Sequence, residues 1–555
     1  MKRKQGIMLV VCLFLMTAIM AVPAFPESLV YRHYEQNVTV RLMGDERVKW
    51  AESEDGYSLM YDRMGYLVYA KSDNKGGMEP SDVKASDIAQ RKQSESDFIS
   101  HTQKQLRFSQ NQISLIKQIF NIHSRESAKE FPSSGNRKLV MLLIGFTDKS
   151  FSKTKTEFIN LMNQTGYSFN NASGSVKDWF LSNSFNQLNL STDVYGPYQA
   201  AHNMAYYGAN DVYGYDVRPR ELVLEAINSA DSEVDFSEYD NDDDGYMDGI
   251  YLIYAGYGEE AGASSNAIWA HAWSISPVVK DGVYISSYSC SPELSGNSGT
   301  NITNIGVICH EFSHVCGLPD FYDTDYSGSG GQSFDLKKWD PMASGSWNNN
   351  GKTPPHHNCY SKTALGWQNT TILNNSVSLY IPNSHDHNVS YRFDTSIHNE
   401  YFMLENRQKS GWDLYIPHHG LLIYHVDKNL SGWNTNDINV NPAHQGMDIE
   451  EADNIRSIET YSGDPFPGTG NVSTFTDESV PGSLNWNGQA TQKPITNICE
   501  TDGIISLDFM GGTPPTLPVT LSAFNAVTVM DQFISLSWVT QSENNMLGYH
   551  LYRSV

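Results

Sequence analysis

Basic residues are scarce in this sequence. Its 555 residues include 38 Lys and Arg against 63 Asp and Glu, a formal net charge of −25. Because no basic stretch follows the first few residues, the chain lacks the positive surface that binds nucleic acid or anionic membranes. Gly and Pro, at 42 and 22 residues, are too few for collagen-like or low-complexity classes. The acidic surplus can solubilise a secreted protein or, where it is clustered, bind hard cations.

Long hydrophobic runs are also rare. Only residues 7–22 approach membrane-spanning length, and this run follows three basic residues and precedes Ala24 in a small-residue cleavage pattern. The layout predicts a secretory signal peptide over residues 1–24, with an uncleaved anchor as the alternative. We therefore expect a secreted monomer without membrane contact after cleavage, or one attached to the cell surface.

Cysteine is the third scarce component. One of the six cysteines falls in the predicted signal, which leaves an odd number, so at least one is unpaired within the chain. The others are too few for a disulfide scaffold. They are Cys290, Cys309, Cys316, Cys359 and Cys499.

Patterns along the chain divide it into units, and its length suggests three or four domains. Residues 57–61 and 66–69 read as a hairpin, and a helical pattern follows. The polar residues 121–138 predict an exposed, protease-sensitive linker. Helical and strand patterns then alternate to about residue 367. Beyond it, short β-like runs separated by turn residues indicate an all-β domain.

The strongest motif is His310-Glu-Phe-Ser-His314. Two histidines four residues apart lie on one face of a helix, so both imidazoles can reach one tetrahedral metal. Gly317 can end this helix in the left-handed conformation that turns the chain sharply. The turn can bring Asp320 back as a third ligand, which leaves a fourth position for water. We therefore predict zinc held by His310, His314 and Asp320.

Residues around this motif have roles of their own. Glu311, adjacent to the metal but not a ligand, is the predicted general base. Met342, in Asp-Pro-Met, has the form of a methionine turn beneath zinc, with ordinary core packing as the alternative. Asp323 and Asp325 compete for the role of third ligand. Tyr360 could assist the oxyanion, but a buried structural tyrosine is the favoured interpretation.

The motifs resemble the immune inhibitor A family of secreted bacterial zinc metalloproteases, which is related to the metzincins. The resemblance spans roughly residues 38–509. It rests on ordered motifs at 174–180, 268–273, 317–322, 339–345, 400–407, 420–427 and 464–468. It implies an α+β fold in which a metzincin-like zinc protease domain follows an N-terminal propeptide and precedes a C-terminal β-sandwich domain.

The predicted organisation combines the residue patterns with this resemblance. We expect a signal peptide at 1–24, a propeptide at 25–136, a zinc metalloprotease catalytic domain at 137–370, a β-sandwich domain at 371–510, a linker at 511–517 and an incomplete fibronectin-type-III-like module at 518–555. The predicted propeptide has no cysteine, so latency must use a carboxylate, the backbone or steric cover. Residues 44–46 (Gly-Asp-Glu) are a candidate plug, and a β-turn is the favoured alternative.

Part of the acidic surplus is clustered. Asp240, Asp242, Asp244 and Asp248 occupy positions 1, 3, 5 and 9 of a calcium-loop pattern with glycine at position 6. Position 12 is not the glutamate of a full EF-hand, so we predict a shorter structural calcium site. A solvated acidic turn is the alternative.

Other polar residues receive simpler interpretations. Asp448 and Asp464 could serve a second cation site, but solvent-facing carboxylates are favoured. His271 is interpreted as structural. The pairs His356–His357 and His418–His419 are interpreted as surface histidines, because neighbours in sequence cannot easily share one metal.

These features predict a secreted zinc-dependent endopeptidase, made as a zymogen, that hydrolyses extracellular proteins or peptides. Zinc would lower the pKa of its water towards about 7. Glu311 would take the proton and deliver it to the leaving amine. The alternative is a secreted calcium-stabilised adhesion or binding protein with an inactive protease-like domain. That alternative leaves the complete zinc motif and its glutamate unexplained.

Overall fold

The structure is a computed structural model. It describes residues 20–33, 35–123, 130–211, 214–326, 328, 330–512, 519–529 and 533–543. Residues 1–19 of the predicted signal peptide lie outside the described residues. Among the helices that the structure describes, none combines the length and apolar character needed to cross a membrane.

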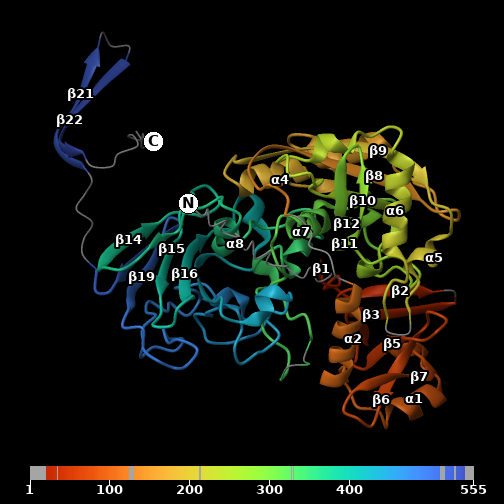
Figure 1. Ribbon diagram of the computed structural model, residues 1–555. Coiled ribbons are helices and arrows are strands. Elements are labelled where there is room, and N and C mark those ends of the chain that lie inside the picture. The colour runs from red at the N-terminus through yellow and green to blue at the C-terminus, as the bar shows by residue number, and fades with distance from the viewer. Residues whose placement is uncertain are drawn as a thin grey trace, which may run out of the picture.

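The N-terminal unit is a six-stranded antiparallel sheet in which each strand pairs with the next along the chain (Figure 1). Its strands are β2 (Leu29–His33), β3 (Gln36–Gly44), β4 (Lys49–Ser53), β5 (Ser58–Tyr61), β6 (Leu67–Ser72) and β7 (Met78–Lys84). Helices α1 (Gln93–Ile99) and α2 (Gln110–His123) follow. The predicted hairpin is confirmed, because β5 and β6 pair antiparallel.

The predicted linker is only partly a linker. Residues 121–123 form the end of α2, and residue 135 already begins strand β8 (Gly135–Gly145). Phe131 is buried, and its ring packs edge-on against Phe312 at 4.9 Å. Polarity along the sequence could not reveal this contact. The prediction of an exposed segment throughout 121–138 was therefore wrong.

The central sheet has the order β1-β11-β12-β10-β8-β9. Strands β8, β9, β10 and β12 run parallel, and β11 pairs antiparallel with β12. Strands β8 and β10 are apolar along most of their length because helices cover both faces. The remaining bounds are β1 (Met20–Ala21), β9 (Leu188–Gln199), β10 (Ile250–Tyr257), β11 (His271–Lys280) and β12 (Val283–Leu294).

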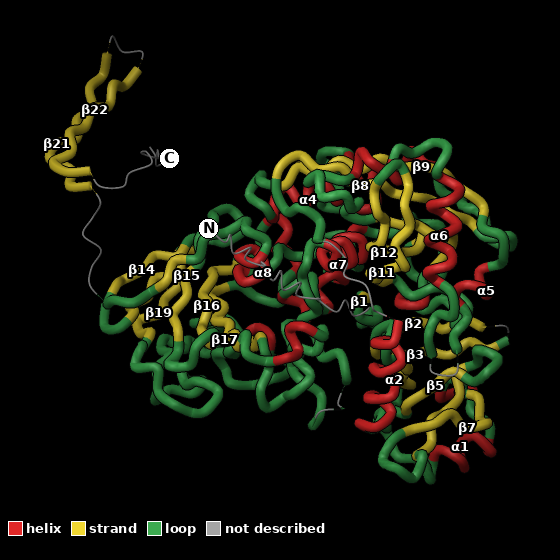
Figure 2. The backbone as a smooth tube through the Cα atoms, viewed as in Figure 1, coloured by secondary structure: helices red, strands yellow, loops and turns green. Residues whose placement is uncertain are grey.

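Two helical layers flank this sheet (Figure 2). On one face, α3 (Lys155–Asn163), α4 (Val176–Asn183) and α7 (Ile305–Val315) share an apolar core with Leu139, Met141 and Leu143. On the other face, α6 (Pro219–Ala230) packs against Val140 and Leu142, and α5 (Met204–Gly208) lies beside it. Alternate residues of β8 thus feed the two cores, as the period of a strand requires.

The C-terminal half contains two further sheets, of order β13-β15-β16-β17-β18 and β14-β20-β19. Both contribute to one apolar core, as face-to-face packing requires. The bounds are α8 (Cys359–Ala364), β13 (Thr371–Ile372), β14 (Val377–Ile381), β15 (Tyr391–Asp394), β16 (Glu400–Arg407), β17 (Gly420–Asp427), β18 (Met447–Ile449), β19 (Ile495–Thr501) and β20 (Ile504–Phe509). Strands β21 (Val519–Val529) and β22 (Phe533–Glu543) pair only with each other among the described strands.

Candidate active site

Helix α7 carries the His-Glu-x-x-His motif through the middle of the molecule (Figure 1). All its residues are buried, so the polar side chains of the motif face protein rather than solvent. The helix ends at Val315, and Gly317 has a φ of +98°. A Cβ at this position would be strained, which explains glycine here and confirms the predicted turn.

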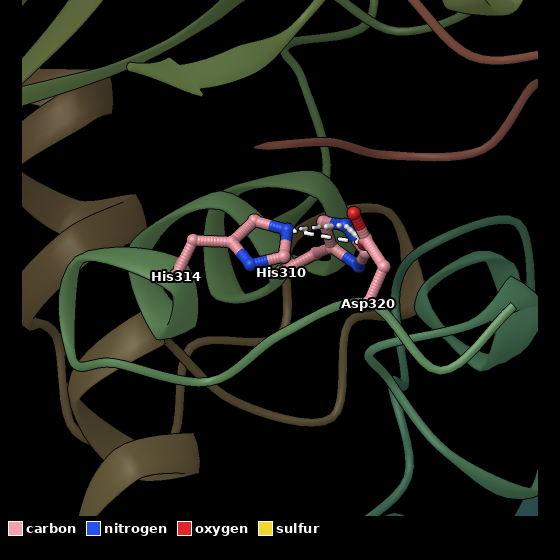
Figure 3. Close-up of side chains that lie close together, drawn as sticks. All are labelled: His310, His314 and Asp320. Carbon is pink, nitrogen blue, oxygen red and sulfur yellow. Dashed lines mark hydrogen bonds and ion pairs between the residues drawn. The ribbon is translucent and has the colours of Figure 1, made fainter. Parts of the chain in front are cut away.

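The turn brings the three predicted ligands together (Figure 3). His310 Nε2 and His314 Nε2 are 3.1 Å apart, and each lies 3.2 Å from Asp320 Oδ1. Ligand atoms about 2.0–2.1 Å from a tetrahedral zinc are separated by about 3.3 Å, so this triangle has the size of a zinc site. Within the described part of the chain, Asp320 Oδ1 has no hydrogen-bond donor, although it is fully buried.

Backbone carbonyls fix the orientation of both histidines. His310 Nδ1 donates to the carbonyl of Pro341, and His314 Nδ1 donates to that of Leu318, each at 2.7 Å. A carbonyl can only accept, so the proton of each ring lies on Nδ1 and each Nε2 presents a lone pair. Burial lowers the pKa of His314, which favours its neutral, ligating form. The donor set therefore fits zinc.

Asn436 holds the third ligand from the C-terminal half of the chain. Its Nδ2 donates to Asp320 Oδ2 at 2.6 Å, and its Oδ1 accepts the Asp320 backbone N–H at 2.7 Å. The site is thus completed by a residue far from the motif in sequence.

The predicted methionine turn lies against the site. Met342 is fully buried, and its carbonyl accepts the backbone N–H of Phe321 at 2.8 Å. Asp340 Oδ1 accepts the Met342 N–H, and its Oδ2 accepts two bonds from Asn358. The same turn supplies the Pro341 carbonyl that orients His310, so its role includes positioning a ligand as well as packing.

Glu311 points towards the N-terminal segment of the chain. Its Oε1 accepts the backbone N–H of Val22 at 2.6 Å, and its Oε2 has no hydrogen-bond partner among the described residues. Burial, followed by the negative charge of Asp320, raises the pKa of Glu311 well above its ordinary value. Without a metal ion beside it, this carboxyl therefore favours its protonated form.

The N-terminal segment, whose Val22 contacts Glu311, lies along the edge of the central sheet. Strand β1 pairs antiparallel with β11, with Ala21 opposite His271. Further along, the Val22 carbonyl accepts a bond from Trp269 Nε1 at 2.9 Å. The Pro23 carbonyl likewise accepts from the Trp347 indole at 2.8 Å. Residues 20–23 therefore occupy the edge of the sheet next to the three ligands.

Tyr322 joins this segment to the N-terminal unit. Its hydroxyl lies 2.7 Å from the Ala21 carbonyl oxygen and 2.9 Å from Asp45 Oδ2. The Asp45 backbone N–H also bonds to the Val48 carbonyl, so residues 44–46 form the expected turn and reach the active-site region. These contacts agree with both interpretations of residues 44–46, the turn and the plug.

The acidic loop is partly preorganised. Asp240, Asp242 and Asp244 each offer a carboxylate oxygen within 4.8 Å of the others. Asp248 is buried and instead accepts the backbone N–H of Asn241 at 2.7 Å. Burial raises the pKa of Asp248 to about 6. The structure thus brings together three of the four predicted ligands, with the fourth beside them.

Several other predicted residues lie outside the ligand set. Asp323 accepts backbone N–H groups from Asp325, Tyr326 and Ser333, which occupies both its oxygens. The Tyr360 hydroxyl accepts a bond from Lys428 Nζ at 2.7 Å, in keeping with a structural role.

Two interpretations of exposed residues were wrong. His356 and His357 are fully buried, because the loop that carries them packs under α4 and bonds to Asn183 and Ser182. Asp448 and Asp464 are buried as well. Asp448 bonds to Arg456 and Gln445, and Asp464 accepts the Trp339 indole N–H at 3.1 Å. In each case tertiary contacts override the local polarity.

The remaining predicted histidines and cysteines are structural or free. His271 is fully buried and bonds to the Trp269 carbonyl and the Tyr288 hydroxyl. His418 and His419 are half-buried at the surface. All five described cysteines are free thiols.

Sequence reasoning missed Asn436 and the role of Tyr322. Asn436 sits 116 positions after Asp320 and belongs to no metal motif, so no local signal could identify it. Tyr322 follows the third ligand by two residues, and this proximity was the one available clue.

Known proteins resemble the chain in this region. Residues 146–372 match the family described as immune inhibitor A peptidase M6, catalytic domain. The pre-pro-metalloprotease PrtV of Vibrio cholerae is 29% identical over 258 residues, which cover 38% of this chain and 27% of that protein. Immune inhibitor A of Bacillus thuringiensis subsp. alesti is 34% identical over 171 residues, 26% of this chain and 24% of that protein.

The aligned region thus spans about a quarter of the length of each of these relatives. The residues matched by the family model, 146–372, contain α7, the turn at Gly317, Asp320 and Met342, and they span less of the chain than the resemblance noted along residues 38–509. The metalloprotease relatives and the ligand triangle both support a peptidase site whose residues can hold a metal ion. Residues 146–372 of this chain are therefore similar to the immune inhibitor A peptidase M6 catalytic domain.

Proposed function

We propose that the protein is a secreted zinc-dependent endopeptidase, made as a zymogen, that hydrolyses peptide bonds in extracellular proteins. The observation that carries the proposal is the buried triangle of two Nε2 atoms and one carboxylate oxygen, with both Nδ1 protons fixed on carbonyls. Zinc, when bound to His310, His314 and Asp320, supplies a Lewis acid and an acidified water.

Glu311 acts as the proton carrier in this proposal. Its buried Oε2 has no hydrogen-bond partner among the described residues and is therefore free to accept a proton from the attacking water. Its Oε1 already lies 2.6 Å from a peptide nitrogen, where a proton must be delivered to the leaving amine. One carboxyl can therefore serve both proton transfers.

The Ala21–Val22 peptide indicates how a substrate would lie. Glu311 contacts its nitrogen, Tyr322 contacts its carbonyl oxygen, and β1 pairs with the edge strand β11. A substrate strand added to the same edge would obtain its main-chain hydrogen bonds from β11. We assign Tyr322 the role of orienting the substrate carbonyl, with Glu311 on the amine side.

The same contacts support latency. Residues 20–23 cover Glu311, and Asp45 of the N-terminal unit engages Tyr322, so a substrate cannot lie there until both are displaced. Cleavage after Ala24, as the signal pattern predicts, would remove this cover, whereas cleavage before residue 22 would keep part of it. Sequencing the N-terminus of the secreted protein distinguishes the two.

Calcium is proposed as a structural ion in the loop of Asp240, Asp242 and Asp244, with Asp248 as support. Oxygen-only donors favour calcium over zinc. The loop precedes β10, so an ion there would connect this surface loop to a strand in the middle of the central sheet.

Removal and return of the metal tests the proposed activity. The processed protein is expected to hydrolyse casein, to lose activity when a chelator removes zinc, and to regain it when zinc is restored. An adhesion protein with an inactive protease-like domain would show no hydrolysis under either condition.

A further inference from the structure

A second buried cluster of charge lies beside the active site. Lys49 of the N-terminal unit places its Nζ 2.5 Å from Glu259 Oε2 and 3.2 Å from Glu46 Oε2. Glu46, Asp216 and Glu259 each offer a carboxylate oxygen within 4.8 Å of the others, and all three side chains are buried. The lysine ammonium thus fills an acidic pocket.

The pocket borders the path of the N-terminal segment. Asp216 Oδ2 accepts the backbone N–H of Trp269 at 2.9 Å, and the indole of that tryptophan donates to the Val22 carbonyl. Glu260, next to Glu259, accepts the Phe25 N–H on its backbone carbonyl at 2.8 Å. The pocket therefore lies beside residues 22–25, on the side that follows the peptide nitrogen contacted by Glu311.

The catalytic domain supplies most of this pocket and leaves part of its capacity unused. Asp216 Oδ1 is buried and has no hydrogen-bond partner among the described residues, and the same holds for Asn210 Oδ1. Asn210 Nδ2 donates to Glu259 Oε1 at 2.9 Å, which fixes that carboxylate. If Lys49 and Glu46 leave with the N-terminal unit, Asp216 and Glu259 remain as two neighbouring carboxylates without that cation. Two like charges held this close repel each other, and a positive group between them removes that repulsion.

We propose that Asp216 and Glu259 form a substrate subsite for lysine or arginine side chains, and that Lys49 occupies it in the zymogen. The inference rests on the proposed peptidase function and adds to it a class of substrate. The subsite would select a basic side chain at a position after the scissile bond. Ammonium and guanidinium groups match its acceptors, and the Trp269 ring, 5.3 Å from Lys49 Nζ, can pack against the aliphatic stem.

Paired peptides test the subsite directly. The processed enzyme is given internally quenched peptides that carry either lysine or uncharged, similarly sized norleucine at each of the first four positions after the scissile bond. At one position we expect lysine to raise kcat/KM by about tenfold or more, the worth of a charge-assisted hydrogen bond. Glu259→Gln should reduce this lysine-to-norleucine ratio to near one, and Asp216→Asn should reduce it in the same direction.

Matched measurements separate the other outcomes. Glu238→Gln, at an exposed carboxylate paired with Lys138, should keep the wild-type ratio. A ratio near one at all four positions in the wild type, or a lysine preference that survives in both pocket variants, would overturn the subsite while leaving the peptidase function intact. A preference abolished by added calcium would instead assign the pocket to a metal ion. If no peptide is cleaved, the result contradicts the proposed peptidase function, and with it the subsite that depends on that function.

Discussion

At the residue scale, the metal site depends on atoms that the motif does not contain. The two histidines and Glu311 could be predicted because a spacing of four residues fixes a helical face. Asp320 could be predicted from the glycine turn. Asn436 could not, since only the folded C-terminal half brings its amide to Asp320.

Asn436→Ala should weaken zinc binding. Loss of the two bonds to Asp320 frees the carboxylate to rotate, and removal of such a supporting partner costs about 10–100-fold in metal affinity. Zinc transfer to a competing chelator measures the change. Asn189→Ala, which removes a surface amide bonded to Asn136, serves as the control and should leave zinc affinity unaltered. Equal affinities in the two variants would refute the supporting role.

At the element scale, α7 and the β5–β6 hairpin are visible in the sequence because local periodicity and turn residues determine them. Strand β1 is not. Its residues read as part of a signal peptide, and their strand conformation arises only through pairing with the edge of β11. The buried loop of His356 and His357 escapes prediction for the same reason, because its surroundings come from distant elements.

Gly317→Ala should destabilise the end of α7. An alanine here would have a left-handed φ of +98°, and its Cβ would lie 2.9 Å from the carboxyl carbon of Glu130, the end of an exposed side chain that can move away. We therefore expect a loss of about 1–3 kcal/mol that comes mainly from the backbone conformation. Gly166→Ala measures the effect of a left-handed φ alone, because φ at Gly166 is +67° and nothing lies within 4 Å of the added Cβ. Thermal unfolding compares the two variants, and the absence of any loss in Gly317→Ala would contradict the backbone account.

Asp242→Asn should abolish stabilisation by calcium. Replacing one carboxylate of the convergent trio weakens an oxygen-ligand site, so added calcium should no longer raise the unfolding temperature. Asp243→Asn alters a neighbour outside the trio and retains a residue type that tolerates its φ of +60°. Unfolding scans with and without calcium should therefore separate the two variants. An unfolding temperature of the wild type that does not change with calcium would contradict the proposed site.

At the scale of the whole molecule, the N-terminal unit docks through buried charge. Glu46, Lys49 and Glu259 meet across the contact, with Asp216 beside them. Composition shows an acidic surplus, but it cannot show which carboxylates are buried at this contact. Sequence likewise predicts a unit before the catalytic domain without revealing that residues 20–23 reach Glu311.

This contact should weaken as pH rises. Burial raises the pKa of Glu46 from 4.5 to about 7, against the opposing effect of Lys49. A raised pKa means that docking favours the protonated form, so stability is fully present below about pH 4.5 and is lost as pH rises through about 7. Unfolding of the Glu311→Gln full chain, which cannot digest itself, should show this loss between about pH 5 and about pH 8.

Glu46→Gln should flatten that profile, because the amide cannot ionise. Glu54→Gln, at an exposed position on the same unit, should leave the profile unchanged. A pH profile that Glu46→Gln leaves unchanged in the Glu311→Gln chain would show that Glu46 does not control the docking.

The most direct test of the peptidase assignment is a comparison of wild type with Glu311→Gln for both casein hydrolysis and zinc content. The substitution keeps the size of the side chain and leaves His310, His314 and Asp320 in place, so zinc content should be unchanged. Hydrolysis should fall by about 100-fold or more because no carboxyl remains to carry the proton. Hydrolysis near the wild-type rate in a zinc-loaded Glu311→Gln protein would contradict the proposed mechanism.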